Sequence, residues 1–187
     1  MQNISEDVLI KASRGDTDAF EKIYRVTSGF VYNVAFRIAN NKEDAEEVTQ
    51  EVFLTIYRKL KNFRFQSSFR TWVYKITTNS AINYCKKRSK EKNRTVAYND
   101  DLKLVSFHSE IEKQIDKEHQ EETITSLLEI LKPDQRACIV LRNIEGLSYK
   151  EIADSLEINI NTVRSRLKRA REILLAHSKL RGVENEM

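Results

Sequence analysis

The chain has 187 residues, 40% of them hydrophobic and 32% charged, which allows one packed core or two small ones. It contains no apolar run long enough to span a membrane, and its two cysteines and three histidines show no metal-ligand spacing. These features argue against a membrane protein, a zinc site, a bound cofactor and a disulfide framework, and they favour a reducing, cytoplasmic location.

Only four glycines and one proline interrupt a sequence rich in Glu, Lys, Leu, Ile and Arg, which predicts an all-α fold. Residues 5–38 show helical spacing of apolar side chains, with a break at Arg14-Gly15-Asp16. Asn40-Asn41 ends this pattern, and Asn41 can cap a further helix that reaches about Leu60. A loop over residues 61–68 follows.

The next helix begins near Phe69 and has a distinct apolar side. At 100° per residue, Phe69, Trp72, Val73 and Ile76 share one stripe, so Trp72 is expected to pack in a core. Tyr74 and Lys75 lie on the opposite side of this helix. The aromatic rings that remain for a ligand are therefore Tyr74 and the loop pair Phe63 and Phe65, although either Phe could instead plug the helical bundle.

Helical periodicity fades from about Ser89 to Ile115 and resumes from Asp116. Pro133 suits the first turn of a helix that ends at Gly146. We therefore expect two small helical domains at residues 1–90 and 118–180, a linker at 91–117 and a tail at 181–187.

The segment LSYKEIADSLEININTVRSRLKRAREIL has the spacing of a helix-turn-helix. Ile152, Ala153 and Leu156 face inward on its first helix, and Asn159 can cap the second. The inward stripe of that second helix is Val163, Leu167, Ala170 and Leu174, and its opposite face presents Asn161, Arg164, Ser165 and Lys168. Such a face fits the major groove of DNA. Glu157 stands at the turn position that Gly often fills, where a left-handed backbone would cost about 1 kcal/mol.

Charges are segregated along the chain. Residues 43–51 are acidic with no base, whereas residues 86–94 and 164–171 are mostly Lys and Arg. This pattern suits a protein that meets a polyanion at two places and another kind of partner at its acidic helix.

The motifs GDTDAFEKIY, DAEEVTQEVFLTIYRKL, FRTWVYKITTN, LKPDQRACIVLRNIEGLSYKEIADSL and TVRSRLKRAR occur in this order. In order and spacing they resemble the extracytoplasmic-function (ECF) sigma factors of bacterial RNA polymerase. The resemblance implies that the first domain corresponds to sigma region 2, which binds the polymerase and the melted −10 element. It also implies that the second corresponds to region 4, which reads the −35 element as duplex.

The resemblance implies three groups of site residues and no catalytic ones. The polymerase-binding residues are Glu47, Gln50, Glu51, Leu54 and Arg58. The residues expected to contact the −10 strand are Phe63, Phe65, Tyr74, Lys75, Asn79, Lys86, Lys87 and Arg88. The residues expected to contact the −35 duplex are Asn161, Thr162, Arg164, Ser165, Arg166, Lys168 and Arg169. The implied partners are core RNA polymerase, promoter DNA and an anti-sigma factor, with no membrane insertion.

The alternative interpretation is a stand-alone helix-turn-helix regulator, which explains the second half but leaves the acidic helix and the FRTWVY segment without a role. Under the sigma interpretation, the linker as a relaxed coil would span about 28 Å, against about 70 Å for two duplex turns. We therefore expect the free protein to be more compact than its promoter-bound form and to bind promoters poorly alone.

Overall fold

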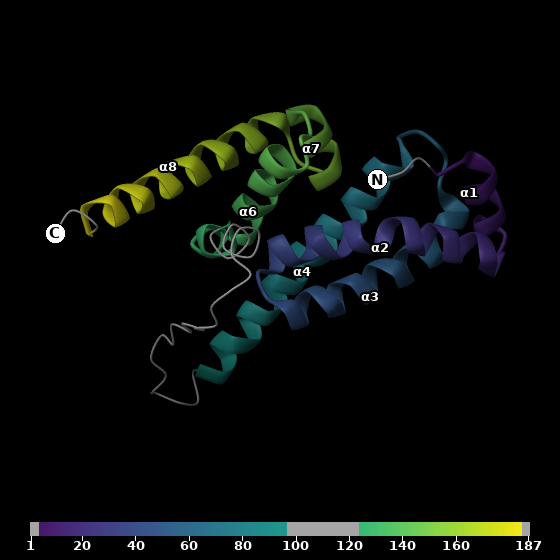
Figure 1. The fold of residues 1–187 in the computed structure, drawn as a ribbon, viewed down its shortest axis with the longest axis horizontal. Coiled ribbons are helices and arrows are strands. Elements are labelled where there is room, and N and C mark those ends of the chain that lie inside the picture. The colour runs from purple at the N-terminus through teal and green to yellow at the C-terminus, as the bar shows by residue number, and fades with distance from the viewer. Residues whose placement is uncertain (1–3, 97–123, 185–187) are drawn as a thin grey trace, which may run out of the picture.

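The computed structural model describes residues 4–96 and 124–184, and within these ranges all regular structure is helical. The first domain comprises α1 (Glu6–Ser13), α2 (Thr17–Ala39), α3 (Lys42–Lys59), the short η1 (Leu60–Asn62) and α4 (Phe69–Val96). In Figure 1, α2, α3 and α4 run alongside one another as a bundle, and α1 covers one end. Their inward stripes supply the core of this domain.

Local sequence explains where these helices begin and end. Asn40 adopts a left-handed conformation with φ of 59°, which terminates α2 as the Asn-Asn pair predicts. The Asn41 side chain then accepts a hydrogen bond from the Asp44 backbone N–H at 2.9 Å and caps α3. The Asp16 side chain caps α2 in the same way through the N–H of Ala19.

The second domain begins with a helical stretch at residues 124–129. It continues with α6 (Pro133–Ile139), the π-helical turn η2 (Val140–Ile144), α7 (Tyr149–Leu156) and α8 (Ile160–Glu184). Pro133 occupies the first turn of α6 as expected. The predicted helix-turn-helix is confirmed, since Ile152, Leu156, Val163 and Leu167 are all buried.

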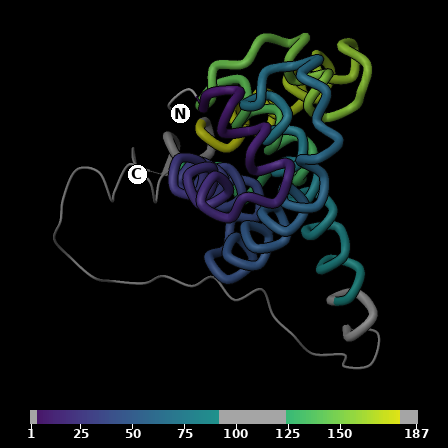
Figure 2. The backbone as a smooth tube through the Cα atoms, turned by 90° about the vertical axis from the view of Figure 1, so that its right-hand side faces the viewer, coloured from purple at the N-terminus to yellow at the C-terminus, as the bar shows by residue number. Residues whose placement is uncertain are grey.

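The two domains pack against each other. Helix α7 contacts α4, and α6 contacts both α2 and α4. Figure 2 shows the second domain, green to yellow, lying against the first. Helix α8 packs on α6 and α7 and projects away from the first domain in Figure 1. Buried apolar residues of both domains belong to one continuous cluster.

Two helices cross the predicted domain boundaries, which stay predictions. Helix α4 continues to Val96, beyond the predicted domain end at residue 90, because Lys, Glu and Arg in this polar stretch are good helix formers. Helix α8 likewise continues to Glu184, into the predicted tail. Residues 97–117 of the predicted linker, and 118–123 after it, lie outside the described residues. In the described part of the chain, no helix combines the length and apolarity needed to cross a bilayer.

Candidate nucleic-acid and polymerase interface

The face of α8 predicted to read duplex DNA is open to solvent. Asn161, Arg164, Ser165 and Lys168 are all exposed, while Val163 and Leu167 of the same helix pack inward. Arg164 Nη1 donates a hydrogen bond to Asn161 Oδ1 at 3.0 Å, which orders two of the side chains on this face. The start of α8 is fixed by Asn159, whose Oδ1 accepts from the Asn161 backbone N–H. The helix therefore presents a set of donors on one accessible side.

The remaining residues of the predicted −35 group differ in exposure. Thr162 is half-buried and Arg169 is exposed. Arg166 turns toward α6, where its Nη2 lies 3.6 Å from Asp134 Oδ1. The turn before α8 contains Glu157 with φ of 54°, so this non-glycine residue does adopt the left-handed backbone whose cost is given above.

The loop between η1 and α4 carries an aromatic cluster. Phe63 lies 5.1 Å from Trp72 and 4.8 Å from Phe65, measured between ring centroids. Phe63 and Trp72 are half-buried, so the expectation that Trp72 is packed fits this cluster. The side chain of Phe65 is 44% exposed, and its backbone is left-handed with φ of 56°. Phe63 therefore packs inside the aromatic cluster, and Phe65 is the ring of this pair that is exposed to solvent.

A pocket of about 410 Å³ opens beside this cluster. Its walls are Asn62, Phe63, Arg64, Gln66, Ser67, Thr71, Trp72 and Lys75 of the first domain, together with Asp154 of the second. Of the polar members of this wall, the sequence predicted Lys75 but not the loop side chains Asn62, Arg64, Gln66 and Ser67, because loop residues carry no periodic signal that orients them. The pocket combines an aromatic wall with amide and hydroxyl groups, which suits an unstacked base.

The expectation that Tyr74 lies on an outward face of its helix is wrong. Tyr74 is only 1% exposed and packs edge-on against Phe30, with 4.6 Å between ring centroids. The reason is that α4 is covered on two sides, by α2 and α3 and also by α7. Burial raises the pKa of Tyr74 well above its usual value, so the phenol stays protonated and can donate a hydrogen bond.

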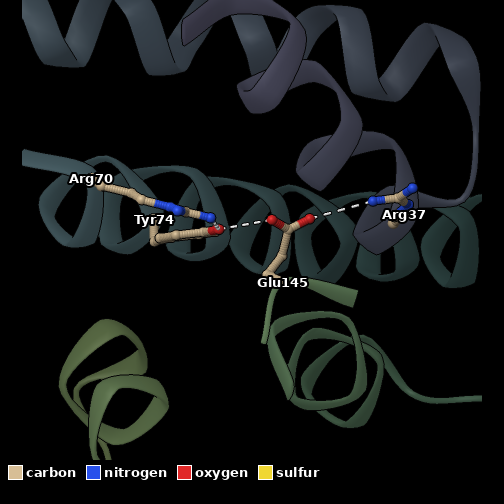
Figure 3. A network of polar contacts seen from close by, with 4 residues as sticks. All are labelled: Arg37, Arg70, Tyr74 and Glu145. Atoms are coloured by element: carbon tan, nitrogen blue, oxygen red, sulfur yellow. Dashed lines mark hydrogen bonds and ion pairs between the residues drawn. The ribbon is translucent and has the colours of Figure 1, made fainter. Parts of the chain in front are cut away.

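That hydrogen bond leads to a polar network between the domains, drawn in Figure 3. Tyr74 Oη donates to Glu145 Oε2 at 2.7 Å, and Arg37 Nη1 lies 3.3 Å from Glu145 Oε1. Arg70 Nη2 donates to Tyr74 Oη at 3.0 Å. Glu145 follows η2, at a helix C-terminus where a carboxylate is disfavoured by the helix dipole. An acidic residue at a helix C-terminus can indicate that a cationic side chain lies nearby. The sequence alone does not show that Arg37 is this side chain.

The predicted phosphate-binding cations all have carboxylate partners. Lys75 Nζ lies 2.7 Å from Glu157 Oε1, and Lys86 Nζ lies 3.1 Å from Asp134 Oδ1. Both of these carboxylates belong to the second domain. Within the first domain, Lys87 pairs with Glu91 one helical turn away, and Arg88 pairs with Asp44 of α3. Asn79 is half-buried on α4.

The predicted polymerase-binding residues gather on α3. Glu47, Gln50, Glu51, Leu54 and Arg58 are exposed, and Leu54 is unusually so for an apolar side chain, at 55%. The first four line a groove of about 710 Å³ between α3 and α4, together with Ser80, Asn83, Tyr84 and Lys87. Tyr84 Oη donates to Glu47 Oε2 at 2.7 Å, and this bond raises the pKa of Tyr84 to about 12.

One buried cation crosses the domain junction. Arg136 of α6 donates from Nη1 to the carbonyl oxygen of Ile38 at 2.9 Å, at the C-terminal end of α2. Its Nη2 donates to the carbonyl oxygens of Glu129 and Leu131 in its own domain. Burial lowers the pKa of Arg136, and the carbonyl groups at the helix end offset part of that cost.

Comparison of the sequence with known proteins gives matches to one family in each of the two domains and to relatives along most of the chain. Residues 23–91 match the family described as Sigma-70 region 2, and residues 121–174 match Sigma-70, region 4. The chain is 30% identical to the RNA polymerase sigma-H factor of Pseudomonas aeruginosa, covering 92% of this chain and 93% of that one. It is 32% identical to the ECF RNA polymerase sigma-E factor of Escherichia coli K12, covering 92% and 94%.

Among solved structures, the fold resembles the sigma factor RpoE from Bartonella quintana, determined in complex with the anti-sigma factor NepR. The TM-score is 0.62 at 23% identity, over 86% of this chain and 96% of that one. The two regions in order, the near-complete coverage and the shared fold lead to one conclusion: the chain belongs to the ECF sigma factors, which direct promoter recognition by RNA polymerase.

Proposed function

We propose that this sigma factor divides promoter recognition between its two domains, with residues 118–180 reading the −35 element as duplex. The observation that carries the proposal is the face of α8 on which Asn161, Arg164, Ser165 and Lys168 are all exposed. Arg reads guanine edges and Asn reads adenine edges in the major groove, while the neighbouring cations hold phosphates.

Residues 1–90 bind the −10 element as a separated strand. The pocket beside Phe63 and Trp72 supports this role, since a flipped base there gains stacking and edge hydrogen bonds. Stacking on one ring contributes about 1–3 kcal/mol, which offsets the few kcal/mol that unpairing one base costs. Phe65, Asn79, Lys75, Lys86, Lys87 and Arg88 complete the proposed strand contact. Tyr74 takes part only when α7 has moved away from α4.

Helix α3 binds core RNA polymerase through Glu47, Gln50, Glu51, Leu54 and Arg58. The exposed Leu54 among carboxylates and an arginine supports this assignment, because an apolar centre within a charged rim is typical of a protein interface. No covalent chemistry falls to the sigma factor, because the polymerase carries out the synthesis of RNA. The protein works in the cytoplasm, with its polymerase.

An anti-sigma factor is a further proposed partner. The support is the likeness in fold to a sigma factor solved in complex with the anti-sigma factor NepR, together with the ECF membership of the chain. Its expected effect is to hold the protein away from core polymerase. Co-purification from cells grown without stress tests this, and recovery of the sigma factor alone would contradict it.

Run-off transcription tests the function as a whole. Core polymerase is incubated with the protein and with sheared DNA from the organism that encodes it, and new transcript starts are mapped. We expect start sites that core polymerase alone does not give. A stand-alone helix-turn-helix regulator would give none without another sigma factor, so an unchanged transcript profile would reject the proposal in favour of that alternative.

A further inference from the structure

Arg166 differs from the other side chains of α8 that the sequence assigns to the −35 duplex. We call the exposed set Asn161, Arg164, Ser165 and Lys168 the reading face. The side chain of Arg166 is 24% exposed, whereas that of Lys168, two residues further on, is 78% exposed. At 100° per residue, Arg166 lies about 150° around the helix from the middle of the reading face. It therefore lies beside the inward side of α8, next to Leu167.

The guanidinium of Arg166 is held on the α6 side of α8. Its Nη2 lies 3.6 Å from Oδ1 of Asp134, a residue in the first turn of α6. Burial raises the pKa of the Cys138 thiol to about 11, and the adjacent Arg166 guanidinium opposes part of that rise. Arg166 and Asp134 also line one groove of about 630 Å³, whose walls include α8 and the start of α6. This cation therefore faces α6 and not the side of α8 that meets DNA.

Asp134 is a well-placed partner for this cation. Pro133 and Asp134 form the first turn of α6, where the positive end of the helix dipole stabilises a carboxylate. Lys86 of the first domain lies 3.1 Å from the same Oδ1. Arg166 and Asp134 both belong to the second domain, so their pair needs no residue of the first.

Base reading depends on the angle of α8 about its own axis. Bidentate contacts of Arg or Asn with a base edge require well-aligned hydrogen bonds. Val163, Leu167 and Ala170 are buried and lie within about 60° of one another around α8. The ion pair of Arg166 with Asp134 adds a contact at one side of this stripe. A contact off the stripe opposes rotation of the helix, which would otherwise turn the reading face away from the base edges.

We propose that Arg166 is a positioning residue for −35 recognition: through Asp134 it fixes the angle at which α8 presents the reading face, and it makes no phosphate contact itself. This inference rests on the proposed function for the reading of duplex DNA by α8. It replaces the direct DNA contact that the sequence suggests for Arg166. Arg166 thus determines how well the protein distinguishes sequences, and it contributes little to the affinity that all duplexes share.

The test uses the full-length protein and two DNA duplexes. The wild type first enriches a duplex from a random-sequence library at low salt. This selected duplex is then compared with a shuffled duplex of the same length and composition, by fluorescence anisotropy over a series of salt concentrations. Each phosphate contact adds about 0.9 to the steepness of log K against log[salt], so the slope counts phosphate contacts. The ratio of the two affinities reports base reading.

Arg166→Gln and its control Lys168→Gln remove the same charge from α8. For Arg166→Gln we expect the affinity ratio to fall about tenfold, equivalent to about one lost bidentate base contact, with the salt slope unchanged. For Lys168→Gln we expect a slope shallower by about 0.9 and an unchanged ratio. Arg166→Lys retains a cation beside Asp134, so it should keep more of the ratio than Arg166→Gln.

Asp134→Asn separates positioning from charge. If charge alone matters, removing an anion strengthens binding to both duplexes and leaves their ratio unchanged. The proposal predicts instead that the ratio falls about as far as in Arg166→Gln. The double variant should lose no more than either single variant, because both substitutions break one pair. Retained binding to the shuffled duplex shows that α8 is still folded in each variant.

The proposal is overturned if Arg166→Gln lowers the salt slope as Lys168→Gln does, or if Asp134→Asn leaves the affinity ratio unchanged. Equal losses on both duplexes in Arg166→Gln, with the ratio preserved, also overturn it. A wild type that enriches no sequence rejects duplex reading itself. A wild type that enriches one sequence, together with any of these contrary results, rejects the positioning role alone and leaves the proposed function in place.

Discussion

The hydrogen bond between Tyr74 and Glu145 joins the two domains, and its contribution can be measured with a double-mutant cycle. The two oxygens are 2.7 Å apart, Tyr74 is 1% exposed and the Glu145 side chain 12% exposed, so water screens this bond poorly. A hydrogen bond to a charged group contributes about 1.5–3 kcal/mol to stability. Arg37 continues to neutralise Glu145 when the phenol is removed, so we expect a coupling energy near the lower limit, about 1.5 kcal/mol.

The cycle comprises the wild type, Tyr74→Phe, Glu145→Ala and the double variant. Urea unfolding is followed by tryptophan fluorescence, because the single Trp72 reports on the first domain, and by far-ultraviolet circular dichroism, which reports on both. If the domains unfold together, the two signals coincide and the cycle gives one coupling energy. A coupling energy below about 0.5 kcal/mol would refute this prediction, because the hydrogen bond between Tyr74 and Glu145 would then not stabilise the packing of the two domains.

Three further predictions concern single residues. Arg164→Ala should weaken −35 duplex binding by about tenfold and leave core polymerase affinity unchanged in a gel-shift and pull-down pair; equal losses would indicate misfolding instead. The pKa of Tyr84 is raised to about 12 in the folded protein, so the bond to Glu47 stabilises fully below pH 10 and its contribution is lost between about pH 10 and 12. Tyr84→Phe should remove that part of the alkaline loss of stability, and identical denaturation profiles would contradict the assignment. Burial raises the pKa of Cys138 to about 11, so a thiol reagent at neutral pH should label Cys85 slowly and Cys138 only after unfolding. Rapid labelling at both cysteines, read by mass spectrometry, would contradict that burial.

Local rules accounted for the helices and for the second-domain motif. Asn40, Asn41 and Pro133 mark helix ends through their own backbone or side-chain chemistry. These helix ends can therefore be predicted from the local sequence alone. The inward stripe of α8 follows from a period of 3.6 residues. Glu157 was singled out as the turn position that Gly often fills, and the structure shows that its backbone is left-handed.

Contacts between the domains could not be predicted in this way. Tyr74 lies outside the main apolar stripe of α4, and it is buried because Phe30 of α2 packs against its ring and Glu145, far along the chain, contacts its hydroxyl. The partners of Lys75 and Lys86 come from the second domain, and a periodic pattern does not encode the distance between two elements. The −10 assignments of these residues remain predictions, since their pairing here is with carboxylates and not with DNA.

The π-helical turn before Glu145 has a consequence for how the two halves of the molecule fit. In that turn the N–H of Glu145 bonds to the carbonyl oxygen of Val140, five residues back, so the backbone holds one residue more than an ordinary helical turn. Deleting one residue from 140–144 would restore ordinary spacing and swing the carboxylate about 100° around the helix axis. The packing of the two domains thus depends on the number of residues in this turn. An insertion or deletion there would move the Glu145 carboxylate out of contact even if no contacting side chain were changed.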